Sequence, residues 1–159
     1  MDILEELFRH NSWATQQLLE HLAGLPPETL EKTAPGTYGS IIATLRHLSG
    51  AEERYLHRAE GTPRREEVME KAELGLDELR REAVGRAERW QRLLATAPDP
   101  DRVIVSKQPD GTEIRIAVKT LLVQAVHHGN DHRTHICTVL GSHGLQVPDL
   151  DAWAFYRED

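Results

Sequence analysis

Two histidines stand four residues apart near the end of the chain, in the segment LLVQAVHHGNDHRTHICTVL. His128 and His132 occupy positions at which the helical pattern of this segment otherwise places aliphatic core residues. In a helix, side chains four residues apart lie on the same face, about one turn apart. Two imidazoles so placed can reach one ion, as in H-E-x-x-H metal sites. A divalent metal ion bound in this way requires a third protein ligand.

A single histidine on an apolar helix face is more often a core residue held by a hydrogen bond than a metal ligand. Two such histidines are harder to bury, because each ring carries two nitrogens that require partners. An unpartnered polar group in a core costs on the order of a few kcal/mol. A metal ion would satisfy one nitrogen of each ring. We therefore predict that His128 and His132 bind a divalent metal ion.

The third ligand has several candidates, of which His47 is the best placed. Its neighbours on the predicted helix face are Ala43, Thr44 and Ala51. Side chains this small leave room for an ion and allow a facing helix to approach closely. The pattern therefore favours His47 without excluding the other histidines.

The remaining histidines are less well placed for the same ion. His135 lies seven residues beyond His128, almost two helical turns, so we expect it to line the site rather than to share the ion. His127 points about 100° away from His128, and His143 lies where the helix is expected to end. Three further candidates lie nearer the ends of their segments: His10, His21 and His57.

Hydrophobic periodicity predicts the elements that must position these side chains. Apolar residues recur at helical spacing in four segments, and glycine or proline follows each of them. The predicted helices cover residues 2–24, 40–60, about 76–97 and 118–140. Residues 25–37 predict a loop with one helical turn. Thr62-Pro63 has the form of a helix N-cap followed by proline in the first turn, so we expect the chain to re-enter a helix there.

Residues 102–117 break the helical pattern just before the last helix. Alternating β-branched residues flank Pro109-Asp110-Gly111, which is typical of a β-hairpin. Four helices joined by short links favour an all-α fold, an up-and-down four-helix bundle with this hairpin inserted before the last helix. We expect residues 1–159 to form one such domain. The aromatic residues of the tail are expected to cover one end of the bundle or a partner subunit: Trp153, Phe155 and Tyr156.

Composition excludes several classes of function. The net charge of −7 and pI of about 5.7 argue against a nucleic-acid partner, because phosphate binding requires a basic face. The single cysteine, Cys137, rules out an intramolecular disulfide and a cysteine-based zinc site, and a reducing cytoplasm is the expected compartment. The N-terminus MDILEELFRHNSW does not have the form of a signal peptide, and no apolar run is long enough to span a membrane.

Three motifs, taken in order, resemble the DinB/YfiT-like metalloprotein superfamily over nearly the whole chain: HNSWATQQLL, SIIATLRHLSGAEERYLHR and HHGNDHR. The resemblance implies a metal triad of His47, His128 and His132, which selects His47 among the candidates above. The chain departs from the family pattern after Arg133. There Thr134 and His135 replace the usual Gly-Gln, which places a bulkier, titratable group beside the expected site.

The resemblance also implies a range of activities. Some relatives are thiol-dependent transferases or isomerases that use bacillithiol, mycothiol or glutathione, and a metal-dependent thiol S-transferase is therefore the expected function. The alternatives are a metal-dependent hydrolase and a non-catalytic metal-binding module of a stress response. Imidazole ligands suit zinc, nickel, copper or iron, of which we expect zinc or nickel. A small-molecule substrate and a homodimer are the expected partners.

Four polar residues are candidates to assist the ion: Asn11, Glu52, Glu53 and Arg133. Each also has a purely structural interpretation, which we favour. Asn11 would form a buried hydrogen bond, the glutamates would be solvated or lie at the edge of the core, and Arg133 would form an ion pair at the surface.

Overall fold

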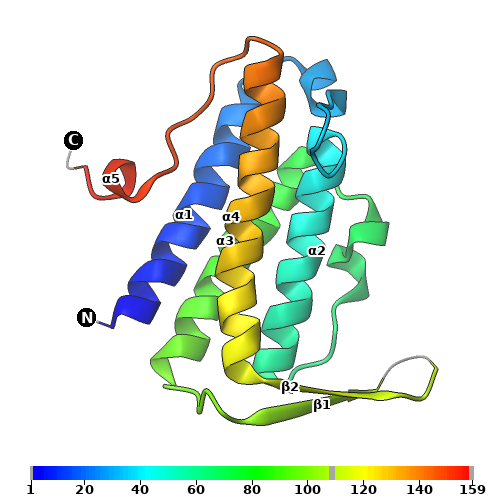
Figure 1. The fold of residues 1–159 in the computed structure, drawn as a ribbon, viewed down its shortest axis with the longest axis vertical. Helices are drawn as coiled ribbons and strands as arrows, with labels where there is room; N and C mark the ends of the chain where they lie inside the picture. The colour runs from blue at the N-terminus through cyan, green and yellow to red at the C-terminus, as the bar shows by residue number, and fades with distance from the viewer. Residues whose placement is uncertain (1, 108–109, 158–159) are drawn as a thin grey trace.

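The computed structural model describes residues 2–107 and 110–157. Four long α-helices form a bundle and contain most of these residues (Figure 1). Each helix ends within two residues of its predicted end, so the predicted helices are confirmed. Their bounds are α1 (Ile3–Ala23), α2 (Ile41–Glu60), α3 (Leu76–Ala95) and α4 (Val118–Ser142).

Shorter elements lie in the connections. They are the 3-10 helices η1 (Pro27–Glu31), η2 (Glu66–Val68) and η3 (Glu70–Ala72), the strands β1 (Val103–Lys107) and β2 (Glu113–Ala117), and the short helix α5 (Ala152–Phe155). The strands pair antiparallel with Ile104 opposite Ile116, which confirms the predicted hairpin before α4. Asp110 and Gly111 lie in the turn as predicted, whereas Pro109 lies outside the described residues.

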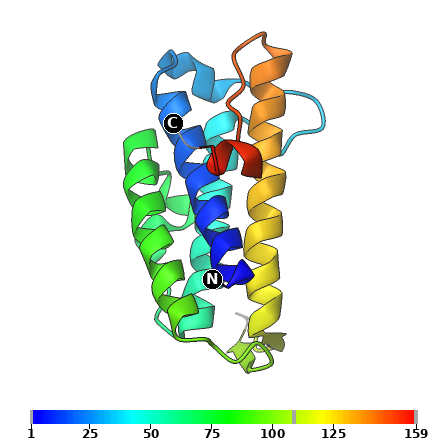
Figure 2. The same ribbon diagram turned by 90° about the vertical axis from the view of Figure 1, so that its left-hand side faces the viewer.

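The helices do not simply alternate in direction, which corrects the expected up-and-down order. Glu52 of α2 bonds to Arg86 of α3, and each of the two residues lies about three turns from the start of its helix. The two helices are therefore parallel. α1 and α4 run in one direction, and α2 and α3 run in the other (Figures 1 and 2).

The connection between α2 and α3 explains this order. Thr62-Pro63 does not begin a helix, contrary to expectation; instead residues 61–75 return along the bundle in an irregular path with two 3-10 turns. A chain of this length can span roughly 50 Å, whereas a 20-residue helix is only about 30 Å long. α3 then begins after Gly75, whose backbone N–H donates to the Glu78 side chain over 2.8 Å.

Each helix therefore packs against two others in a square arrangement. α1 contacts α3 and α4, and α2 contacts the same two helices on the opposite side. The side formed by α2 and α4 is consequently opposite the side formed by α1 and α3 (Figure 2).

The apolar core consists of two clusters at different heights in the bundle. One lies where α1 ends and α2 begins, and includes Leu18, Ile41 and Leu140. The other lies near the hairpin and includes Phe8, Trp90 and Val118. Between them the helices bury a layer of polar side chains: Asn11, Thr15, Ser49, Glu52, Arg86 and Arg133.

The aromatic tail packs along the side of α1 and does not cover an end of the bundle, which corrects the first of the two predicted alternatives; a contact with a partner subunit stays a prediction (Figures 1 and 2). The Phe155 ring lies 5.3 Å from the ring of Trp13, and the Tyr156 hydroxyl donates to Glu6 over 2.7 Å. Trp153 points outward and is 83% exposed. The tail thus stabilises the outer surface of α1.

Candidate metal centre

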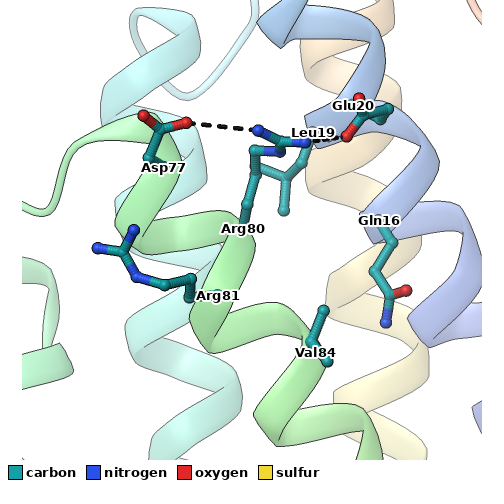
Figure 3. A pocket seen from close by; sticks show the side chains of 7 residues that line it. All are labelled: Gln16, Leu19, Glu20, Asp77, Arg80, Arg81 and Val84. Atoms are coloured by element: carbon teal, nitrogen blue, oxygen red, sulfur yellow. Dashed lines mark hydrogen bonds and ion pairs between the residues drawn. The ribbon is translucent and has the colours of Figure 1, made fainter.

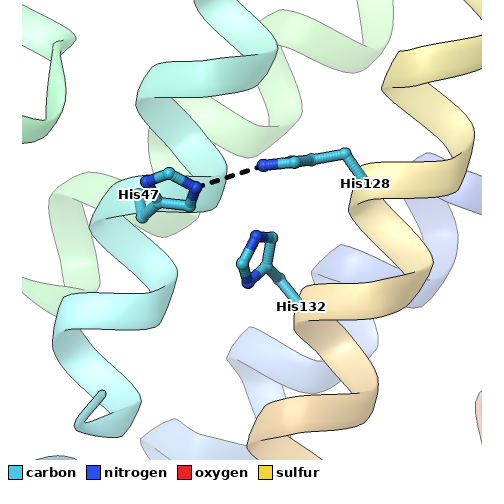
Figure 4. A group of neighbouring side chains, drawn as sticks. All are labelled: His47, His128 and His132. Carbon is cyan, nitrogen blue, oxygen red and sulfur yellow. Dashed lines mark hydrogen bonds between the residues drawn. The ribbon is translucent and has the colours of Figure 1, made fainter. Parts of the chain in front are cut away.

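The three predicted ligands lie on two neighbouring helices. His47 comes from α2, and His128 and His132 come from α4, which packs against α2 in the opposite direction (Figure 4). Ser40 caps the start of α2 by accepting a hydrogen bond from the backbone N–H of Ala43. This cap begins the helix two turns before His47 and so sets the position of its side chain.

The three imidazole rings converge in the space between the two helices (Figure 4). One nitrogen from each ring lies within 4.8 Å of the corresponding nitrogens of the others. The Nε2 atoms of His47 and His128 are 3.2 Å apart, and the rings of His128 and His132 are 4.3 Å apart. The structure therefore brings together the three histidines that the sequence singles out.

This spacing suits a metal ion. Zinc–imidazole bonds of about 2.0–2.1 Å in a tetrahedral arrangement place ligand nitrogens roughly 3.3 Å apart. The Nε2 atoms of His47 and His128 already have this separation. Three protein ligands also leave at least one position on the ion for water or substrate, as in catalytic rather than structural sites.

The protonation states of the rings favour metal binding as well. Burial lowers the pKa of His128 to about 4, assisted by the neighbouring His132 and His47. Burial and the adjacent His47 and His135 also lower the pKa of His132. Both rings are therefore neutral at pH 7, and a metal ion can bind them without displacing a proton.

A carboxylate behind His47 completes the site, and sequence patterns did not predict it. An oxygen of Glu70 lies 3.1 Å from Nδ1 of His47, on the side of the ring away from His128. The Tyr38 hydroxyl donates to the same carboxylate over 3.1 Å, and the Tyr38 ring stacks on His47. A carboxylate in this position fixes the orientation of a ligating imidazole and raises its basicity.

Glu70 reaches the site because the connection between α2 and α3 lies directly against α2. A Cβ atom on Gly50 would lie 2.6 Å from the backbone nitrogen of Glu70, closer than any side chain allows. Burial acts to raise the pKa of Glu70, but hydrogen bonds from His47 and Tyr38 outweigh it and hold the pKa below its usual value. The carboxylate is therefore ionised when it contacts His47.

The other histidines occupy separate positions. The ring of His135 lies 5.3 Å from that of His132, but His135 is not one of the residues whose nitrogens converge. The Nδ1 atoms of both rings are buried and have no hydrogen-bond partner among the described residues. The remaining histidines bond to loop carbonyls or lie at the surface: His10, His21, His57, His127 and His143.

The polar residues considered as helpers are buried in the bundle, where they bond to other side chains. Asn11 is 1% exposed, and its side-chain oxygen accepts a hydrogen bond from Arg133 over 2.9 Å. Glu52 accepts hydrogen bonds from Trp90 and Arg86, and Glu53 pairs with Arg89. These contacts agree with the structural interpretation of Asn11. They correct that of the glutamates, which are buried and paired rather than solvated or at the edge of the core.

Arg133 differs from its structural prediction. Its side chain is buried rather than at the surface, and it also donates to the Thr15 hydroxyl over 2.9 Å. Burial lowers the pKa of Arg133 to about 10, so the guanidinium remains charged at neutral pH. Gly129 makes room for this contact, because a Cβ atom there would lie 2.5 Å from the Asn11 side-chain oxygen.

A groove of about 510 Å³ lies on the opposite side of the bundle, between α1 and α3 (Figure 3). Its most prominent charged group, Arg80, is neutralised by Glu20 and Asp77. The groove contains none of the three histidines, so its chemistry is separate from theirs.

The fold and the site together define a helical bundle with a histidine cluster suited to a divalent metal ion. The sequence matches the DinB family over residues 1–158, so the chain belongs to this family. A similar curated protein, Protein DinB of Bacillus subtilis (strain 168), is 23% identical over 157 residues, which cover 94% of this chain and 91% of that protein. Among the described residues, no helix is both long and apolar enough to cross a membrane.

Proposed function

We propose that this chain binds one divalent metal ion, zinc or nickel, through His47, His128 and His132, and that it acts as a metal-dependent thiol S-transferase. The convergence of three imidazole nitrogens within 4.8 Å is the observation that carries the proposal. Membership of the DinB family supports it. A bound dication with three neutral ligands lowers the pKa of a thiol or water at its open position, which supplies a nucleophile near neutral pH.

The side chains of the chain would serve this chemistry in distinct ways. His128 and His132 are neutral at pH 7, so they add no positive charge that would weaken ion binding. Glu70 orients His47 through its Nδ1 atom. In the overall reaction the thiol sulfur forms a bond to an electrophilic carbon, the leaving group departs with its bonding electrons, and the thiol proton passes to solvent.

The proposal can be tested with monochlorobimane as the electrophile and glutathione, bacillithiol or mycothiol as the thiol. The S–C bond formed and the chloride released are both measurable. We expect conjugation that requires the added ion and that is lost in the His128→Ala variant, while His127→Ala retains it. Absence of metal-dependent conjugation with all three thiols would refute the transferase.

Turnover without added thiol and thermal stability distinguish the two other candidate functions. A metal-dependent hydrolase would use the same three ligands but would turn over its substrate without added thiol. A non-catalytic metal-binding module would lose thermal stability on replacement of His128 and would have no turnover to lose. The small-molecule substrate, the homodimer and the cytoplasmic location remain predictions.

A further inference from the structure

A row of cationic side chains extends from the candidate metal centre along α2. Arg54 and Arg58 follow His47 at intervals of seven and four residues. At 100° per residue, all three positions lie within about 20° of one line along the helix. Because helical side chains lean toward the N-terminus of their helix, Arg54 leans back toward His47.

The part of α2 that carries Arg54 lies against the metal centre. The ring of Tyr55, the next residue in the chain, is 5.8 Å from that of His128 in an edge-to-face arrangement. α2 and α4 also pack directly against each other. The segment of α2 around Arg54 is therefore a neighbour of the metal centre in space as well as along the helix.

Neither arginine has a partner in the part of the chain that the structure describes. Both are partly buried, yet the side chain of neither arginine forms a hydrogen bond or an ion pair there. The other partly or fully buried arginines all have one, as in the pairing of Arg89 with Glu53 and Glu60. The chain has 26 acidic and 19 basic residues, so acidic partners are not scarce.

Leaving these two cations unpaired is energetically unfavourable. Burial lowers the pKa of Arg58, and the nearby charges of Arg54 and Arg64 lower it further. A dication bound by three neutral imidazoles would add to this repulsion. An anionic ligand that extends from the metal centre toward Arg58 would offset both the burial of these unpaired cations and their repulsion from the ion. Arginine binds carboxylate and phosphate groups with matched geometry.

We propose that Arg54 and Arg58 form an anion-binding subsite, which holds an acidic group of the thiol substrate while its sulfur lies at the metal centre. The inference rests on the proposed function and names the substrate class as an acidic low-molecular-weight thiol. The α-carbons of His47 and Arg54 are separated by roughly 10 Å along the helix, which suits a thiol of tripeptide size.

The test uses protein loaded with cobalt(II), an ion that imidazole ligands accept and whose thiolate complexes absorb in the near ultraviolet. Titration of this absorbance gives the dissociation constants of glutathione, which has two carboxylates, and of its diethyl ester, which has none. In the Arg54→Gln variant we expect glutathione to bind about tenfold more weakly, as for the loss of a charge-assisted hydrogen bond, and the ester to bind as before.

Two controls make the result specific. Arg81→Gln removes an arginine from the surface of α3, on the opposite side of the bundle, and should leave both dissociation constants unchanged. The visible spectrum of bound cobalt should be the same in Arg54→Gln and wild type, which shows that the metal centre itself is intact. The Arg58→Gln variant should also bind glutathione more weakly than wild type.

Binding of succinate, measured by calorimetry, separates the two proposals. If glutathione and its ester lose affinity equally in Arg54→Gln, or neither does, the anion subsite is refuted while thiol binding stands. If no thiol gives the absorbance but succinate binds and is weakened by Arg54→Gln, the thiol function is refuted and the subsite stands. If neither thiols nor succinate bind, both proposals are wrong.

Discussion

Nδ1 of His47 and a carboxylate oxygen of Glu70 are 3.1 Å apart, although the two residues belong to different elements of the bundle. Because the opposite nitrogen of the ring faces His128, the carboxylate determines which nitrogen of His47 is available as a ligand. The connection between α2 and α3 is therefore part of the candidate site.

Replacing Glu70 with glutamine tests this relationship. The amide keeps the size of the side chain but removes its charge, so the Glu70→Gln variant should bind zinc about tenfold more weakly, the lower end of the effect of such partners. Calorimetric titration with zinc measures the change. Glu73→Gln, three residues along the same connection, is the matched control. Equal affinities in wild type and Glu70→Gln would show that the carboxylate does not support the ligand.

The triad itself predicts a stoichiometry. Wild-type protein purified without a histidine tag should contain one zinc or nickel ion per chain by elemental analysis. The His132→Ala variant should contain much less than one, because two imidazoles leave the ion with too few protein ligands. His127→Ala, which removes an exposed histidine next to the triad, should retain the full ion content. Retention of the ion by His132→Ala would exclude this residue as a ligand.

The pH dependence of metal binding follows from the lowered pKa values. A histidine of ordinary pKa near 6.5 must lose a proton to bind metal at pH 5.5, but the pKa of His128 is about 4 and that of His132 is also lowered. At pH 5.5 His128 should therefore contribute almost no proton to the release that accompanies metal binding. Calorimetry in buffers of different ionisation enthalpy measures the number of protons released per ion. Release of three protons, one from each ligand, would contradict the lowered pKa of His128.

The metal-free protein should lose stability over the same range. The pKa of His128 is about 4 in the folded protein, against 6.5 for an unperturbed histidine, so the unfolded chain binds a proton first as the pH falls. The free energy of unfolding should therefore decrease from pH 6.5 downward and level off near pH 4. Urea denaturation at pH 7.5 and 5.5 should show a smaller decrease for His128→Gln than for wild type. An equal decrease in the free energy of unfolding would show that a group other than His128 dominates the pH dependence.

Gly50 offers a test of the packing that brings Glu70 to the site. The Gly50→Ala variant places a methyl group 2.6 Å from the backbone nitrogen of Glu70, so the connection must move away from α2. We expect a loss of about 1–3 kcal/mol of stability, as for other overpacked sites, together with weaker zinc binding. Gly85→Ala in α3 meets no atom within 4 Å and should stabilise the protein by about 0.5–1 kcal/mol. Thermal or urea denaturation compares the two variants.

The buried contact between Asn11 and Arg133 should contribute to stability rather than to metal binding. Asn11→Leu removes one acceptor of a buried guanidinium, which should cost about 2 kcal/mol, typical of hydrogen bonds to charged groups. Gln17→Leu, on the exposed face of α1, should change stability little. An Asn11→Leu variant as stable as Gln17→Leu would show that the Thr15 hydroxyl and the backbone carbonyl of residue 11 are sufficient acceptors for Arg133.

Periodic features of the sequence predicted most of the fold and the core of the candidate site. The spacing of apolar residues gave the four helices, and the interval between His128 and His132 placed both on one face. His47 was favoured by its small neighbours and by the family resemblance. These features depend on local geometry, which the order of residues determines directly.

The remaining features depend on non-local contacts. Glu70 lies in an irregular connection with no periodic pattern, and its role arises from the close approach at Gly50. Arg133 was expected at the surface because arginine is rarely buried, but Asn11 and Thr15 supply its partners from another helix. Thr62-Pro63 has the local pattern of a helix start, but no helix begins there, because the chain must first return along the bundle before α3.

The parallel course of α2 and α3 has a consequence for how the protein folds. In an up-and-down bundle, consecutive helices can pair as hairpins soon after they form. Here α1 packs beside α3 and α4, and α2 pairs with α4 across the site, so three of the four lateral pairs join helices that are not consecutive. Each such pair must close a long loop before its contacts form. We therefore expect this bundle to fold more slowly than hairpin-built bundles of equal length, because its contact order is higher.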